Sequence, residues 1–295
     1  MVYIKRVKQK RDISNDQPDY RQNFCHSLGS FTNYGFCCPI YSSNIEKGFF
    51  DMTNKQAKSG IIYQGPSLID NEPIVVIATY SPHNRKTGAM VQTWIMRADV
   101  TPLEASKRGL DYSICGGCKH KGAPNSDPNA KQAKERSCYV ILGQAPTIVY
   151  KTFLNGKYDD MTGHDKTSEI GSGRMVRLGS YGDPSAVPSF IWDSLLENSS
   201  GHTGYTHQTN IASADVRPDL CMISADNESQ ARDAWAQGSR TFRIISDYSE
   251  LVTDKEIACP SQTKGIQCEA CKLCMGASMA KSIAVIKHGN GAKYV

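Results

Sequence analysis

The sequence predicts an α/β fold with parallel strands, and two observations support this prediction. From residue 175 onward, short apolar runs alternate with segments that have the character of helices or crossovers. This alternation is typical of parallel βα units. Before that point, two further apolar runs are rich in β-branched residues, which favour strands.

The expected elements follow in chain order. Residues 1–70 are polar with weak periodicity, so we expect an irregular N-terminal extension containing a few strands or turns. The apolar run 74–78 predicts a buried strand, and 91–96 predicts a second strand that serves as its hairpin partner. In the later series we expect strands at 175–179, 203–206, 220–224, 240–245 and 283–286, and helices at 188–196 and 227–237.

Capping residues define the two expected helices. Pro188 suits the first turn of the earlier helix, because a proline lacks the backbone N–H that would be unpaired there. Asn227 can cap the start of the later helix, and Gly238 suits its end. The chain therefore divides into an extension (1–70), a core with the first cysteine group (71–257), and a cysteine segment with the last strand (258–295).

Composition limits the class of protein. The 295 residues carry a net charge of +5, and the basic residues are scattered, so nucleic-acid binding has weak support. No apolar run follows the basic start, and none approaches the roughly 18 residues of a membrane helix. We therefore expect a cytoplasmic protein with no signal peptide and no membrane span.

Eleven cysteines make metal binding the strongest functional expectation. An odd count with C-x-x-C spacing does not suit a secreted disulfide framework. Cys25, Cys37, Cys38 and Cys221 fit the simpler role of buried apolar residues.

The C-terminal cysteines, which we call the second cysteine group, form one of two candidate ligand sets. Cys268, Cys271 and Cys274 make a C-x-x-C-x-x-C run, and Cys259 can fold back as a fourth ligand. Such a run is characteristic of iron–sulfur ligation. Zinc also takes four thiolates, more often as two separated pairs. We therefore expect a [4Fe–4S] cluster, with zinc as the alternative.

The first cysteine group, Cys115, Cys118 and Cys138, is the other candidate set and offers three thiolates. A fourth ligand could come from Cys221, His120 or a C-terminal cysteine. Alternatively, three cysteines hold a cluster with one open iron, or the pair is redox-active or structural. Both groups could also meet around one centre.

Polar residues recur at the ends of the expected strands. In parallel sheets the chemistry gathers just beyond the carboxyl ends of the strands. Arg177 lies within a strand and needs a partner if buried, which Asp183 or Asp226 could supply. Tyr205 and His207 flank Thr206, so an extended segment turns both to one face. The catalytic candidates are Arg177, Tyr181, Asp183, His207 and Asp226, and the strand ends also offer Gln208, Asp247 and His288.

Several of these strings resemble an uncharacterised family of tailed bacteriophages and prophages. They include residues 177–184, 203–208 and 221–226, both cysteine groups, and the earlier residues 84–88 and 92–94. The resemblance covers roughly residues 75–290. It implies a partial (β/α) barrel related to radical S-adenosylmethionine enzymes, working in the host cytoplasm. The usual C-x-x-x-C-x-x-C motif of that enzyme class is absent from this chain.

Three functional hypotheses follow. The first is a phage-encoded iron–sulfur protein, with a radical-SAM-like or redox activity on an unknown small molecule at the strand ends. In that case Arg177 holds an anionic group and His207 moves protons. The second is a zinc-stabilised module that binds nucleic acid or a host factor. The third is a catalytically silent barrel that acts as a scaffold.

Overall fold

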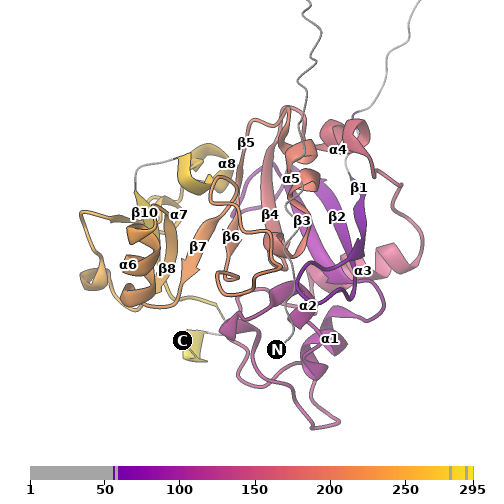
Figure 1. The fold of residues 1–295 in the computed structure, drawn as a ribbon, viewed down its shortest axis with the longest axis horizontal. Helices are drawn as coiled ribbons and strands as arrows, with labels where there is room; N and C mark the ends of the chain where they lie inside the picture. Colours follow the sequence, from indigo (N-terminus) through magenta and orange to yellow (C-terminus); the bar gives the residue numbers. More distant parts are fainter. Residues whose placement is uncertain (1–55, 57–58, 279–280, 290–291, 295) are drawn as a thin grey trace, which may run out of the picture. The chain divides into compact units, whose positions relative to one another are not determined.

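The computed structural model describes residue 56 and residues 59–278, 281–289 and 292–294. All of them belong to the second of the two units into which the chain divides, Thr53–Val295. Within this unit the described strands form two five-stranded sheets, and the fold is mixed α/β (Figure 1).

The first sheet contains both antiparallel and parallel strands, in the order β1-β2-β3-β4-β5. The first three strands pair antiparallel, whereas β4 and β5 add in parallel. A parallel neighbour requires a long crossover, and the crossover from β3 to β4 carries the first cysteine group. The strands are Ser59–Pro66 (β1), Pro73–Ser81 (β2), Met90–Arg97 (β3), Met175–Tyr181 (β4) and Gly201–Thr203 (β5).

The second sheet is entirely parallel, in the order β6-β7-β8-β10-β9. A single residue, Gly204, separates β5 from β6, so the second sheet starts where the first one ends. The Gly204 carbonyl accepts a hydrogen bond from the amide of Met222, the first residue of β7, at 3.0 Å. The residue between the two sheets is therefore itself hydrogen-bonded to the second sheet. The strands are Tyr205–Thr206 (β6), Met222–Ala225 (β7), Thr241–Ile245 (β8), Glu256–Ala258 (β9) and Ser282–Ile286 (β10).

The helices are short, and among the described residues none is long and apolar enough to cross a membrane. The α-helices are Pro102–Arg108 (α1), Tyr112–Cys115 (α2), Ala145–Leu154 (α3), His164–Gly171 (α4), Ser189–Leu196 (α5), Glu228–Ala236 (α6), Pro260–Thr263 (α7) and Cys268–Cys271 (α8). The 3₁₀ helices are Lys119–Lys121 (η1), Pro184–Ala186 (η2), Tyr248–Glu250 (η3), Gly276–Ser278 (η4) and Ala292–Tyr294 (η5).

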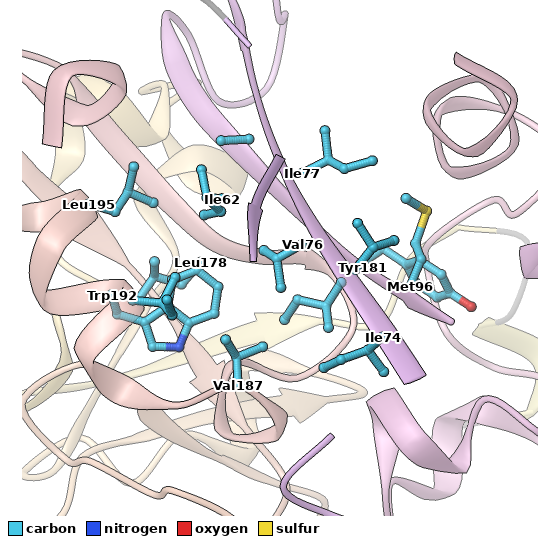
Figure 2. Close-up of a cluster of buried hydrophobic side chains, with 14 of the residues drawn as sticks. Ile62, Ile74, Val76, Ile77, Met96, Leu178, Tyr181, Val187, Trp192 and Leu195 are labelled. Atoms are coloured by element: carbon cyan, nitrogen blue, oxygen red, sulfur yellow. The ribbon is translucent and has the colours of Figure 1, made fainter. Parts of the chain in front are cut away.

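The main core belongs to the first sheet. Residues 74–78 of β2 are all buried, which requires cover on both faces of the strand. Trp192 of α5 and Leu178 of β4 belong to the same buried cluster, part of which Figure 2 shows. The indole N–H of Trp192 donates to the Pro184 carbonyl at 3.0 Å, so its polar atom is paired despite 1% exposure.

Most expected elements are confirmed with shifted ends. The expected hairpin is β2 paired with β3, and the expected helices are α5 and α6. Asn227 caps α6 by accepting from the Gln230 amide at 2.9 Å, and Gly238 follows its end with φ +76°. Pro188, however, is the N-cap of α5 and lies outside its first turn.

The N-terminal expectation needs a correction. Part of the expected extension 1–70 belongs to the first sheet, because Ser59–Pro66 pairs with β2 as its edge strand. Residues 1–55, together with Cys25, Cys37 and Cys38, lie outside the described residues. The segment 203–206 was expected as one strand and is broken at Gly204.

A bulge in β4 shapes the strand beside the site. Gln92 pairs with Arg177 and Trp94 pairs with Tyr181, so β4 holds two more residues than β3 over this interval. Gly179 adopts φ +64° there, a conformation that favours glycine. The Thr93 hydroxyl accepts from the Gly179 amide at 2.8 Å and donates to the Arg177 carbonyl at 3.1 Å. The bulge is therefore a hydrogen-bonded feature that sets the directions of Arg177 and Tyr181.

Candidate functional site

One cavity of about 220 Å³ collects the residues singled out from the sequence. Its walls come from the crossover after β3, the carboxyl ends of β4, β6 and β7, the strands β8 and β10, and the crossover from β9 to β10. All seven candidate ligand cysteines and all five catalytic candidates line it. Cysteine groups separated by more than a hundred residues in sequence are thus brought to one space.

The first cysteine group sits on a short helix and a tight turn. Cys115 ends α2, and Gly116 follows with φ +49°, so the chain reverses before Cys118. A side chain at Gly116 would meet the Gln208 amide oxygen, which approaches to 2.0 Å of the position a Cβ would take. Cys138 joins the group because its amide donates to the His120 carbonyl at 2.9 Å.

The second cysteine group docks on the turn between β2 and β3. The amides of Cys268 and Glu269 donate to the carbonyls of Lys86 and Thr87 at 3.4 Å and 2.9 Å. In return, the Glu269 carboxylate accepts from the Ala89 amide at 2.7 Å. Helix α8 is therefore hydrogen-bonded to the turn-rich segment 81–88.

The far end of the second group is held by a buried arginine. Arg240 is 7% exposed and donates to the carbonyls of Gly276 at 2.6 Å, Leu273 at 2.8 Å and Lys281 at 2.9 Å. The Cys274 carbonyl accepts from Gly204 at 3.3 Å, which ties the loop to the junction between the sheets.

Burial dominates the electrostatics of the thiols. It raises the pKa of Cys118 and of Cys274 to about 12, and it raises the pKa of Cys115 well above the ordinary value. Within each group the neighbouring cysteines raise these pKa values further. The thiols of Cys115, Cys118 and Cys274 are therefore protonated at neutral pH in the metal-free chain, and a metal would have to displace those protons. No disulfide joins any of the cysteines that the structure describes.

Arg177 is a buried cation whose partner is a phenol. Its Nη2 donates to the hydroxyl of Tyr139, and its Nε has no hydrogen-bond partner among the described residues. Burial alone would lower the pKa of Arg177, but Tyr139, Tyr205 and Cys268 raise it above its ordinary value. The expected pairing with Asp183 or Asp226 is wrong, because both carboxylates bond elsewhere.

Asp183 is a junction of hydrogen bonds. One carboxylate oxygen accepts from the Ser185 amide at 3.1 Å and the Ser185 hydroxyl at 2.9 Å. The other accepts from the His207 amide at 2.9 Å and the Gln208 side chain at 3.1 Å. With both oxygens occupied, Asp183 joins the end of β4 to the end of β6 and positions its neighbours.

His207 and Asp226 lie close together, and His120 joins them. Nε2 of His120 lies 3.1 Å from Oδ1 of Asp226, and Nε2 of His207 lies 3.8 Å from the same oxygen. Burial lowers the pKa of His207, which keeps its ring neutral at pH 7. Tyr181 lies in the same cavity with a buried hydroxyl that has no partner within the described residues, and burial raises its pKa well above the ordinary value.

The remaining strand-end residues separate into two kinds. His288 lines the cavity and its Nε2 lies 3.2 Å from the ammonium of Lys86. Asp247 instead caps η3 by accepting from the Ser249 amide at 2.8 Å, so its role is local. Tyr205 and His207, which were expected on one face of an extended segment, both line the cavity.

Sequence reasoning missed several residues of the site. Tyr139 and Lys86 line the cavity, and Arg240 anchors the cysteine loop. Tyr139 could have been suspected because it follows Cys138 directly. Nothing in the sequence pattern marks Arg240, because its partners are backbone carbonyls more than thirty residues away.

Comparison with known proteins gives no relative. No family model, no curated protein and no solved structure matches this chain. The resemblance to phage proteins therefore stays a prediction, and the function is argued from the cavity.

Proposed function

We propose that this protein binds iron–sulfur clusters through its two cysteine groups. The observation that carries the proposal is that seven thiols from two distant segments line one cavity. The described cysteines form no disulfides, which leaves each thiol available as a ligand. Cys221, by contrast, is 5% exposed and belongs to the apolar core.

The spacing of the C-terminal cysteines along the chain favours a cluster over zinc. Cys268, Cys271 and Cys274 form a C-x-x-C-x-x-C run, which is characteristic of iron–sulfur ligation. Zinc sites more often use two separated pairs of cysteines.

The surroundings of the cysteines fit an enzyme acting on a small anionic molecule. Among the described residues, the Nε of the buried Arg177 cation and the hydroxyl of Tyr181 in the same cavity have no hydrogen-bond partner. We assign Arg177 to an anionic group of the substrate and His207 to proton transfer. A cluster on the first group, with three cysteines and one open iron, would supply electrons or bind substrate.

We also propose that the two sheets form one partial (β/α) barrel wall. The support is that β5 and β6 are consecutive and separated by Gly204 alone. The cavity residues Asp183, His207 and Asp226 each follow the carboxyl end of a parallel strand, where α/β proteins place their chemistry.

The test is iron, acid-labile sulfide and zinc analysis of full-length protein purified without oxygen, with an absorption spectrum. We expect a brown protein with a broad band near ~400 nm. Cys118→Ser and Cys271→Ser should each remove part of the iron, whereas Cys221→Ala, a control outside both groups, should remove none. A colourless protein with stoichiometric zinc would overturn the proposal and favour a zinc-stabilised module that binds nucleic acid or a host factor.

A further inference from the structure

A second kind of ligand set lies in the same cavity and contains no cysteine. His120 comes from η1, His207 follows β6 and Asp226 follows β7. One ligand atom from each lies within 4.8 Å of the other two. The His120 side chain is 9% exposed, that of Asp226 15% and that of His207 25%. The three residues are therefore mostly enclosed and converge from three separate elements.

The distance between His120 and Asp226 matches that of two ligands on one metal ion, and the distance between His207 and Asp226 is slightly longer. Metal–nitrogen and metal–oxygen bonds of 2.0–2.1 Å put neighbouring ligand atoms roughly 3.0–3.4 Å apart at octahedral or tetrahedral angles. Oδ1 of Asp226 lies 3.1 Å from Nε2 of His120 and 3.8 Å from Nε2 of His207. Small side-chain rotations would bring all three atoms to bonding distance.

The outer contacts are those that usually orient metal ligands. The other ring nitrogen of His120, Nδ1, lies 2.7 Å from the Ser137 hydroxyl, which leaves Nε2 facing Asp226. The second oxygen of Asp226 lies 3.4 Å from the ammonium of Lys119. The backbone of His207 is fixed by Asp183 at 2.9 Å. Metal-bound histidines typically carry such a contact on the nitrogen that does not bind the metal.

We propose that His120, His207 and Asp226 hold one divalent first-row transition-metal ion. Two imidazoles and one carboxylate suit Fe²⁺, Zn²⁺, Co²⁺ and Mn²⁺, and they leave coordination positions open. All three residues line the cavity, so the open positions face the space that the cysteines also face. The site adds to the iron–sulfur proposal and does not depend on it.

Mn²⁺ is the probe of choice, because it prefers oxygen and nitrogen ligands and avoids thiolates. Titration of the full-length protein, followed by the electron paramagnetic resonance signal of unbound Mn²⁺, should show one ion bound per chain. Asp226→Asn and His120→Gln should each weaken binding at least tenfold, and Ser137→Ala several-fold. His164→Gln, on the exposed start of α4, is the matched control and should change nothing.

The results separate this site from the cysteine centres. Acid-labile sulfide measured on the same samples reports on clusters at the cysteines alone, because the His and Asp site can itself hold iron. Mn²⁺ binding without sulfide would therefore support this site and contradict the cluster. Absence of Mn²⁺ binding to the wild-type chain would overturn the proposal. Unchanged Mn²⁺ affinity in a folded Asp226→Asn or Ser137→Ala variant would also overturn it, and would leave His120 and Asp226 as an ordinary hydrogen-bonded contact.

Discussion

The hydroxyl of Tyr139 accepts a hydrogen bond from the buried guanidinium of Arg177. Tyr139 follows Cys138 of the first cysteine group, and Arg177 acts electrostatically on Cys268 of the second. This contact therefore links the residue after Cys138 to a positive charge that acts on the second group. Lys86 adds a second cation beside Cys268 and Cys259.

Removing the Arg177 charge should lower the reduction potential of a cluster on the second group. A cation several ångströms away in a partly buried site favours the more negative, reduced state by about 1–3 kcal/mol. Arg177→Gln should therefore shift the midpoint to more negative values in a spectroelectrochemical titration. Arg174→Gln, whose guanidinium stacks on Tyr80, is the control and should leave the midpoint in place. An unchanged midpoint in Arg177→Gln would contradict this electrostatic role.

Gln208 should prove essential to the first cysteine loop. Its amide oxygen accepts from Gly117 at 3.0 Å, and its nitrogen donates to the Cys115 carbonyl at 2.6 Å. Gln208→Ala removes these two part-buried hydrogen bonds and the buried one to the Asp183 carboxylate, so we expect a loss of about 2–3 kcal/mol in urea unfolding. Iron bound by the first group should also fall. Gln237→Ala, at the exposed end of α6, is the control, and equal losses in the two variants would refute the prediction.

Arg240→Met should loosen the segment that carries Cys274. The change removes a buried charge that serves three carbonyls, Leu273, Gly276 and Lys281. We expect a destabilisation of about 3 kcal/mol and faster amide exchange over residues 273–277. Arg232→Met, on the exposed face of α6, removes one ion pair with Glu228 and should cost less than about 1 kcal/mol. Unchanged amide exchange in Arg240→Met would show that the segment is held by other contacts.

Asp111 should make the protein less stable as the pH rises. Burial raises its pKa from 3.8 to about 6, and its Oδ1 has no hydrogen-bond partner in the described part of the chain. A raised folded-state pKa means that the stabilisation is complete below pH 4 and is lost as the pH rises through 6. The shift corresponds to about 3 kcal/mol.

Asp111→Asn tests this pH dependence. It should flatten the stability profile between pH 4 and 6 and raise the stability at pH 7, as measured by urea unfolding at each pH. Asp233→Asn, on the exposed face of α6, should leave the profile unchanged. A slope that persists in Asp111→Asn would assign the pH dependence to other groups.

Local patterns predicted the elements and the residues that follow them. The alternation of apolar runs located β4, β7, β8 and β10. His207 and Asp226 were selected because they follow expected parallel strands, and both line the cavity. β1 was not located within the expected extension because its apolar run, Ile61-Ile62-Tyr63, is only three residues long and its pairing with β2 is a tertiary contact. The helices α3 and α4 were missed because their signals lie within a long polar crossover.

The supporting contacts of the site could not be predicted. Gln208 reaches Cys115 across 93 residues, and Arg240 reaches Gly276 across 36. Partnerships of this kind depend on how the sheets are arranged, and no periodicity in the chain encodes them. The wrong partner for Arg177 has the same origin, because a phenol in the crossover occupies the position expected for a carboxylate.

The position of β10 sets the order in which the cavity can be completed during translation. β10 lies between β8 and β9 in the sheet, although β9 precedes it in the chain. A nascent chain that ends before residue 282 therefore has no partner for β9, and Cys259, whose amide donates to Ala284 at 2.8 Å, has no anchor. A cluster proposed for the second cysteine group would thus have to be delivered late, after the synthesis of the last strand.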